Sequence, residues 1–201
     1  MGKKKDILRY LEQRLHAPRY RHSLAVAECT VALAKEHRHW TDPQQERVTL
    51  KQLQWVALLH DCEKERPEKE LWAMLQSDPS LDLQNLSTTP FVWHAFAGAL
   101  TAQRHFGLED PKLLDAIRYH ATGRPAMSQE EMLLFLADAI EPSRSYEGVE
   151  KLRCLAHKDL EAALLYSLER INEELCRRGE PRSVYGLEAL AYYQKRQKEK
   201  G

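Results

Sequence analysis

Residues 55–61 read Trp-Val-Ala-Leu-Leu-His-Asp, an apolar run that ends in an imidazole and a carboxylate side by side. Leaving an ionisable side chain buried without a partner is costly. If the apolar run is a buried helix, both His60 and Asp61 need something to bind at its end. A divalent metal ion is one such partner, because imidazole nitrogens and carboxylate oxygens are common metal ligands. The stretch therefore predicts a core helix that leads into a polar site.

Helical periodicity continues on both sides of this stretch. Runs in which β-branched and polar residues alternate are absent, so we expect little or no sheet. Prolines and glycines divide the chain into segments, and the residue before a proline is biased away from helix. The predicted fold class is all-α, a helical bundle, with helices at about residues 7–15, 19–37, 43–60, 91–106, 111–120, 128–140, 152–178 and 187–197, a short helix opened by Pro67, and an irregular loop over 77–90.

The length of 201 residues suits one domain, since domains of about 100 to 200 residues are the commonest size. No shift in composition marks a boundary. We expect a single domain over 1–201, with its core at about 15–175 and a C-terminal helix and frayed tail at 180–201.

The composition excludes several classes of function. With 30 basic and 30 acidic residues there is no overall field to attract a nucleic acid. The four cysteines match no disulfide scaffold or zinc knuckle, which favours a reducing compartment. The longest apolar runs are far short of the ~18 residues that a spanning helix needs. We therefore expect a cytoplasmic protein with no nucleic-acid partner and no membrane span.

Further polar residues interrupt other apolar segments. His22 begins one such helix and Asp138 lies inside another, while His94 and His120 occur in the segments between them. Any one of these alone is more often a structural residue, but the succession on separate helices indicates a nitrogen and oxygen site for iron, manganese or zinc. Together with His60 and Asp61, six candidate ligands could hold one or two ions. The remaining histidines have polar neighbours and are interpreted as surface residues: His16, His37, His39, His105 and His157.

Three stretches carry a resemblance to a known family. The order His22, His60-Asp61, Asp138 is similar to the signature of the HD superfamily. More specifically, residues 59–64 (Leu-His-Asp-Cys-Glu-Lys), 117–125 (Ile-Arg-Tyr-His-Ala-Thr-Gly-Arg-Pro) and 136–144 (Leu-Ala-Asp-Ala-Ile-Glu-Pro-Ser-Arg) resemble the YqeK family of HD-domain symmetrical bis(5′-nucleosyl)-tetraphosphatases. Family members more often hold an aromatic and a small residue where this chain has Cys62 and Glu63.

The resemblance implies an activity and a division of the ligands. It implies hydrolysis of diadenosine tetraphosphate at its centre to two ADP, with iron as the expected cofactor. In such a site Asp61 would bridge two metals, with His22, His60 and Asp138 on one ion and His94 and His120 on the other. Without the resemblance, the residues themselves indicate hydrolysis of a phosphoester or phosphoanhydride by a water that the metal activates.

Phosphate oxygens also need cationic or amide donors. Lys64 lies one helical turn beyond His60 if the helix continues, so its amine could reach the same pocket and take part in catalysis. Arginine binds phosphate bidentately. The arginines near proposed ligands, with the turn that precedes one of them, complete the candidate phosphate contacts: Arg19, Arg144, and Thr122-Gly123-Arg124. A solvated surface position is the alternative for each of these cations.

Two other interpretations stay open. The chain could be a different HD-domain phosphohydrolase acting on other nucleotides, because the ligand set would be the same. It could also be a non-catalytic regulatory module that binds metal and nucleotide, and an open coordination position would distinguish an enzyme from such a module. The expected partners are a dinucleoside polyphosphate substrate and its ADP product, with a homodimer as an open alternative.

Overall fold

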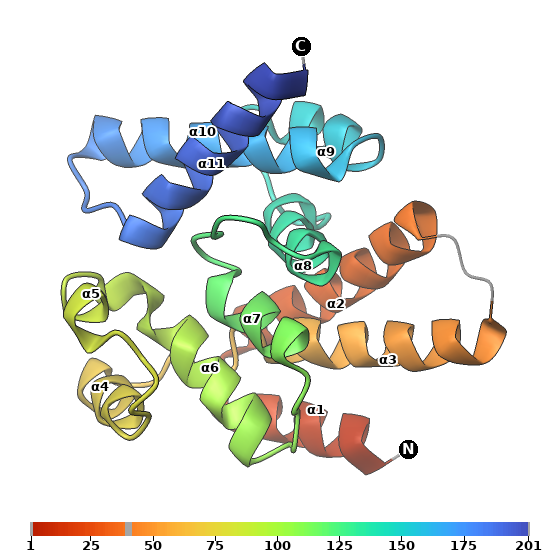
Figure 1. The fold of residues 1–201 in the computed structure, drawn as a ribbon. Helices are drawn as coiled ribbons and strands as arrows, with labels where there is room; N and C mark the ends of the chain where they lie inside the picture. The colour runs from red at the N-terminus through yellow and green to blue at the C-terminus, as the bar shows by residue number, and fades with distance from the viewer. Residues whose placement is uncertain (1, 39–41, 201) are drawn as a thin grey trace.

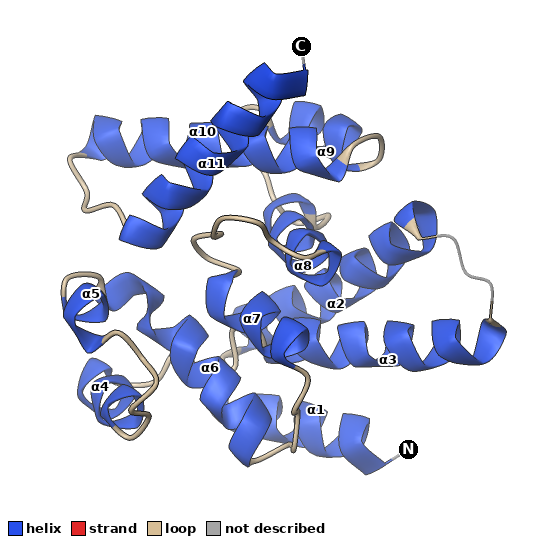
Figure 2. Cartoon of the chain, in the orientation of Figure 1, coloured by secondary structure: helices blue, strands red, loops and turns tan. Residues whose placement is uncertain are grey.

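The computed structural model describes residues 2–38 and 42–200, and every regular element in this part of the chain is helical (Figures 1 and 2). This confirms the all-α prediction. The elements are α1 (Gly2–Arg14), α2 (Ala17–His37), α3 (Pro43–Leu59), α4 (Glu68–Gln76), α5 (Leu83–Ser87), η1 (Pro90–Val92), α6 (Trp93–Arg104), α7 (Pro111–Tyr119), α8 (Gln129–Ile140), α9 (Val149–Ala156), α10 (Leu160–Arg178) and α11 (Val184–Lys200). Among the described residues, no helix has the length and apolarity needed to cross a bilayer.

The centre of the fold is formed by α2, α3, α7 and α8. Helix α2 packs on α3 and α8, and α7 packs on α3, α6 and α8 (Figure 1). Leu33, Val56, Ile117 and Leu136 are among the buried side chains that join these helices in one core. Helix α10 packs against α8, α9 and α11 and so attaches the C-terminal helices to this centre. A second apolar cluster lies where α4 packs on α6.

Side-chain caps explain where several helices begin. Asp42 accepts from the backbone N–H of Gln44, and Asp110 accepts from that of Lys112. At α8 Ser128 and Glu131 form a reciprocal capping box. Such caps satisfy N–H groups that have no partner within the helix.

Two predicted elements were wrong in their bounds, and in both cases an aspartate that was not predicted caps the start of a helix. The helix expected over 152–178 is two helices, because the Asp159 carboxylate accepts from the N–H groups of Glu161 and Ala162 and starts α10 anew. The loop expected over 77–90 contains the short helix α5, whose N-cap Asp82 accepts from the N–H of Asn85. Apolar periodicity does not detect such caps, since they act on the backbone.

Two glycines with positive φ give a matched test of backbone strain. Gly148 (φ 88°) precedes α9, and a Cβ there would lie 2.6 Å from the Tyr166 hydroxyl. Gly107 (φ 60°) has no such neighbour within 4 Å. We expect Gly107→Ala to lower the free energy of unfolding by about 1 kcal/mol, from the left-handed backbone alone. Gly148→Ala should cost roughly 2 to 4 kcal/mol, because steric overlap adds to the same strain. Urea denaturation measures both, and equal losses would contradict the packing argument.

Candidate functional site

The fold brings the six predicted ligands together from five helices. His60 follows the last residue of α3, and Asp61 is the next residue. His120 follows α7 in the same way, while His94 lies in the first turn of α6. His22 comes from α2 and Asp138 from the last turn of α8. Ligand atoms of these residues form three overlapping triads, each with its atoms within 4.8 Å of one another: His22, His60 and Asp61; His60, His120 and Asp138; and Asp61, His94 and His120.

Asp61 lies at the centre of the cluster. Its Oδ1 is 3.3 Å from His94 Nε2 and 3.5 Å from His120 Nε2. Its Oδ2 is 3.6 Å from His60 Nε2. One carboxylate therefore faces histidines on both sides, which is the arrangement that a bridging role would require. At the edge of the cluster His22 Nε2 lies 3.0 Å from Asp138 Oδ1.

Three of the four histidines are oriented through their outer nitrogen. The Nδ1 of His60 lies 2.6 Å from the carbonyl oxygen of Ala57, and the Nδ1 of His120 lies 2.8 Å from that of Ile117. A carbonyl accepts only from N–H, so in both rings Nδ1 carries the proton and Nε2 presents its lone pair to the cluster. For His22 the outer acceptor is a carboxylate oxygen of Glu141, 3.1 Å from Nδ1.

Glu141 was not among the predicted site residues. It is fully buried and accepts from the backbone N–H of Ser143 at 2.7 Å as well as from the His22 ring. Outer carboxylates of this kind orient a metal-binding imidazole and raise its basicity. The signal available in the sequence was a glutamate between an apolar helix and Pro142, where burial requires partners.

Two buried atoms test whether the cluster suits a cation. His60 Nε2 and Asp61 Oδ1 are buried without a hydrogen-bond partner. Burial lowers the pKa of His60 to about 4 and that of His94 also to about 4, so both rings are neutral and offer lone pairs near pH 7. Burial raises the pKa of Asp61, but its interactions with His60, His120 and His94 outweigh burial and hold that pKa well below its usual range. An ionised carboxylate among neutral imidazoles fits a divalent metal ion.

At the edge of the cluster, Asp138 and His22 shift each other's pKa. Burial opposes the charged form of each group. The hydrogen bond between them outweighs burial, so the pKa of Asp138 is lowered and that of His22 is raised. The carboxylate of Asp138 is therefore ionised and available to a cation.

Three of the predicted phosphate contacts reach the cluster. Arg19 Nη1 donates to Asp61 Oδ2 at 2.8 Å, and Arg144 Nη2 donates to Asp138 Oδ1 at 2.5 Å. Lys64 Nζ lies 3.1 Å from His94 Nε2. With Asp61, these cations line a cavity of about 360 Å³, which we call the central cavity.

The backbone between His60 and Lys64 differs from the prediction. The α-helix does not continue past Leu59; residues 60–65 form tight turns instead, in which the Lys64 N–H bonds to the Asp61 carbonyl at 3.0 Å. In these turns Lys64 is three residues after Asp61, and its amine still lies beside the cluster. Burial lowers the pKa of its amine, against the opposing charge of Asp61.

Glu63 anchors these turns from behind. Its buried carboxylate accepts from the Tyr10 hydroxyl at 2.6 Å, from the Thr101 hydroxyl at 2.7 Å and from Arg66 Nε at 2.5 Å. The turn that carries His60, Asp61 and Lys64 is thus tied to both α1 and α6. Glu63 stands at a position where the resemblance led us to expect a small residue.

None of Thr122, Gly123 and Arg124 is among the residues that line the central cavity. Arg124 donates from Nε to Glu131 Oε1 at 2.6 Å and from Nη2 to Glu131 Oε2 at 2.9 Å. The Thr122 hydroxyl donates to the Gly123 carbonyl. After His120 the chain turns away toward the start of α8, where the fully buried Glu131 requires a cationic partner. Nearness to His120 in the sequence therefore did not translate into nearness in space.

Four of the five histidines interpreted as surface residues have other partners in the structure. His16 pairs with Glu65 and His157 with Glu36. The His37 ring is hydrogen-bonded to the Ala156 carbonyl, and the His105 ring makes an edge-to-face contact with Phe106. None of these four belongs to the triads of the cluster, and His39 lies outside the described residues.

The chain is similar to proteins of known family. The profile of the HD domain matches residues 19–143. A symmetrical bis(5′-nucleosyl)-tetraphosphatase of Bacillus subtilis is 33% identical over 89% of this chain and 90% of its own length. A protein of the same name from Halalkalibacterium halodurans is 35% identical over 87% of this chain and 88% of its own. The crystal structure of a predicted HD superfamily hydrolase involved in NAD metabolism from Clostridium acetobutylicum superposes with a TM-score of 0.85, at 31% identity, over 96% of this chain and 97% of that one.

Arg124→Ala tests whether this arginine stabilises the fold by pairing with Glu131. Removing it leaves the buried Glu131 carboxylate without its cation, which should lower the free energy of unfolding by at least about 2 kcal/mol. Arg104→Ala, which removes an exposed contact with Ser77, should cost less than about 0.5 kcal/mol. Denaturant unfolding and metal content after purification are the measurements. Weakened nucleotide binding in a variant of unchanged stability would return Arg124 to the phosphate site.

Glu141→Gln tests the orientation of His22. We expect the affinity for a divalent metal to fall by about 10- to 100-fold, because the amide is a weaker acceptor than the carboxylate. Glu36→Gln is the matched control, since Glu36 also faces a histidine Nδ1 but lies away from the cluster. Equilibrium dialysis against graded metal concentrations, with circular dichroism as a check on folding, gives both values. Equal affinities in the two variants would show that Glu141 does not support the site.

Proposed function

The chain belongs to the HD-domain family and, within it, to the YqeK family of symmetrical bis(5′-nucleosyl)-tetraphosphatases, and we propose that it hydrolyses diadenosine tetraphosphate symmetrically to two ADP. The observation that carries this proposal is the cluster of four imidazoles and two carboxylates, in which His60 Nε2 and Asp61 Oδ1 are buried and unpartnered. Such a donor set beside three cations suits a polyphosphate whose bridging bond is to be cleaved.

The proposed cofactor is iron, with one or two ions per chain and manganese or zinc as the alternatives. Asp61 faces histidines on both sides, which supports a shared carboxylate between two positions. His22, His60 and Asp138 would hold one ion, and His94 and His120 would hold the other. When bound, the metal would supply Lewis acidity at a phosphoryl oxygen and a water of lowered pKa.

The cations of the central cavity would bind the polyphosphate. Lys64, Arg19 and Arg144 all line this cavity, and each has N–H donors beside a carboxylate or imidazole of the cluster. The guanidinium groups could bind phosphate oxygens in pairs, while the ammonium of Lys64 would act as a point charge near His94. Asp61 would hold the Arg19 guanidinium in position before substrate arrives.

Product analysis tests the activity directly. Purified protein is incubated with diadenosine tetraphosphate under reducing, iron-supplemented conditions, and nucleotides are separated by chromatography. We expect ADP as the only product, and chelation should abolish its formation. AMP together with ATP would show asymmetric cleavage and overturn the proposal, and an absence of hydrolysis would favour the regulatory module or another nucleotide substrate.

Two histidine variants connect the activity to the cluster. His60→Gln should lower turnover at least about a hundredfold, because it removes a proposed ligand from the centre of the site. His157→Gln changes an exposed histidine that pairs with Glu36, and it should retain wild-type turnover. The same chromatographic assay measures both rates. Wild-type turnover by the His60→Gln protein would show that the chemistry happens elsewhere.

A further inference from the structure

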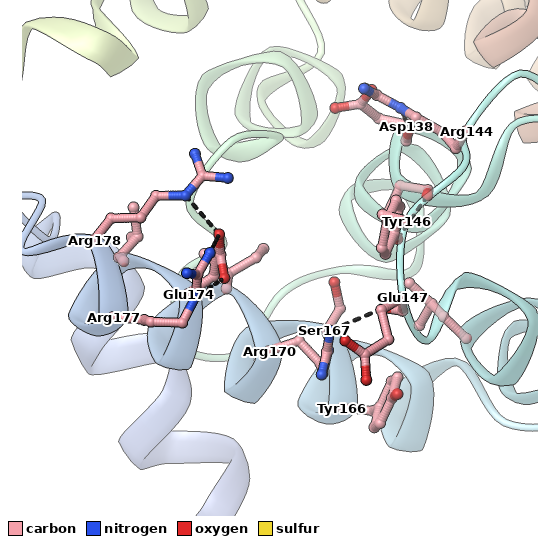
Figure 3. Close-up of a pocket in the computed structure, with 14 residues that line it drawn as sticks. Asp138, Arg144, Tyr146, Glu147, Tyr166, Ser167, Arg170, Glu174, Arg177 and Arg178 are labelled. Atoms are coloured by element: carbon pink, nitrogen blue, oxygen red, sulfur yellow. Dashed lines mark hydrogen bonds and ion pairs between the residues drawn. The ribbon is translucent and has the colours of Figure 1, made fainter.

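A second cavity opens directly beside the central cavity. It has a volume of about 580 Å³ and lies between the loop after α8 and one face of α10 (Figure 3). Asp138, Ala139, Arg144 and Ile171 line both cavities. The two cavities therefore adjoin, and we call the second one the side cavity.

One wall of the side cavity presents an aromatic ring. Tyr146 is 44% exposed, and its hydroxyl donates to the Ala139 carbonyl at 2.8 Å, which holds the ring in place. Leu152, Ile171 and Leu175 add apolar surface to the lining. Ile171 is itself 39% exposed, although it is a large aliphatic residue. A ring held by a hydrogen bond next to the exposed Ile171 and the half-buried Leu175 is a surface on which a flat heterocycle can stack.

A second tyrosine, Tyr166, also lines the cavity, and most of the polar lining lies on α10. The polar residues on α10 follow one helix face, because each lies three or four residues from one in the turn before it: Ser167, Arg170, Glu174, and then Arg177 and Arg178, which are three and four residues beyond Glu174. From residue 167 to residue 178 this face is about 16 Å long. Arg170 donates to the Glu147 carbonyl at 2.8 Å and so joins the two walls (Figure 3). The Glu147 and Glu174 carboxylates offer acceptors of the kind that sugar hydroxyls bind.

We propose that the side cavity is a nucleoside subsite, which binds one nucleoside of the substrate with its base on Tyr146 and its phosphates directed past Arg144 toward the cluster. This proposal rests on the proposed function and adds the location of one half of the substrate. The volume falls within the range of about 300 to 1,000 Å³ that is usual for small-molecule sites.

The neighbouring cavities do not offer the same surface. The cavity beside Phe91 and Leu187 also meets the central cavity at Ile171, but its volume is only about 40 Å³. The cavity of about 370 Å³ near His16 and Ser143 is lined by charged and small polar residues, His22 and Pro18, with no tyrosine, tryptophan or phenylalanine. Tyr146 and the aliphatic lining therefore favour the side cavity for the base.

Two variants alter the side cavity without touching the cluster. Tyr146→Leu keeps an apolar side chain but removes the ring face. Leu175→Trp fills the cavity from α10, where Leu175 is half-buried. Phe91→Leu is the matched control, because Phe91 is 42% exposed and lies outside the side cavity. Circular dichroism and thermal unfolding confirm that each variant is folded.

Calorimetric titration of the metal-loaded protein with ADP and with pyrophosphate separates the nucleoside from the phosphates. We expect Tyr146→Leu to raise the Kd for ADP by about tenfold, the loss typical of one base–aromatic stack, and Leu175→Trp to raise it at least as much. The Kd for pyrophosphate should stay unchanged in both variants. Phe91→Leu should change neither value.

The subsite is overturned if the wild-type protein binds ADP no more tightly than pyrophosphate, or if both variants keep the wild-type Kd for ADP or weaken both ligands equally. Failure of the proposed function gives a different result. Selective loss of ADP binding in the variants, in a protein that does not hydrolyse diadenosine tetraphosphate, would leave the subsite standing while removing that substrate. Hydrolysis to two ADP with unaltered ADP binding in the variants would support the proposed function and remove the subsite.

Discussion

The ionisation of Asp61 inside the protein is the constraint on which the site depends. Its side chain is almost completely buried, and a carboxylate in such a position stays charged only where donors or cations compensate for the lost water. Arg19 donates to its Oδ2, whereas the Nε2 atoms of His60 and His120 face it with lone pairs, so a bound metal ion would supply the remaining compensation. The packing of α2, α3, α6 and α7 on one another brings these groups together around Asp61.

Two of the cluster histidines lie at helix ends, where a local hydrogen bond sets the orientation of each ring. His60 and His120 each follow the last residue of a buried helix, and each ring donates back to the carbonyl three residues earlier. These carbonyls have no partner within the helix, so one hydrogen bond satisfies the helix end and sets the imidazole tautomer at once. The same local geometry occurs at the ends of α3 and α7, where a free carbonyl and a cluster histidine lie three residues apart.

Buried glutamates stabilise the surroundings of the cluster. Glu141 orients His22, Glu63 ties the turn of residues 60–65 to α1 and α6, and Glu131 holds Arg124 at the start of α8. Each carboxylate is buried and satisfied by several donors, as a charge removed from water must be. None of the three glutamates lines the central cavity or the side cavity, so binding of a substrate there need not disturb these supports.

The amino-acid sequence by itself determined the helical class, most helix positions and the six residues of the cluster. Apolar periodicity is a local property, and a histidine or aspartate inside an apolar segment is visible without knowing its partner. The tertiary structure alone decided which cations reach the cluster: Arg19 and Arg144 do, whereas Arg124 is taken by Glu131. It also revealed Glu141, the anchoring role of Glu63 and the cavity beside Tyr146. Those features depend on contacts between residues far apart in the chain, because the partner that satisfies a buried charge is selected by packing in space and not by spacing along the sequence.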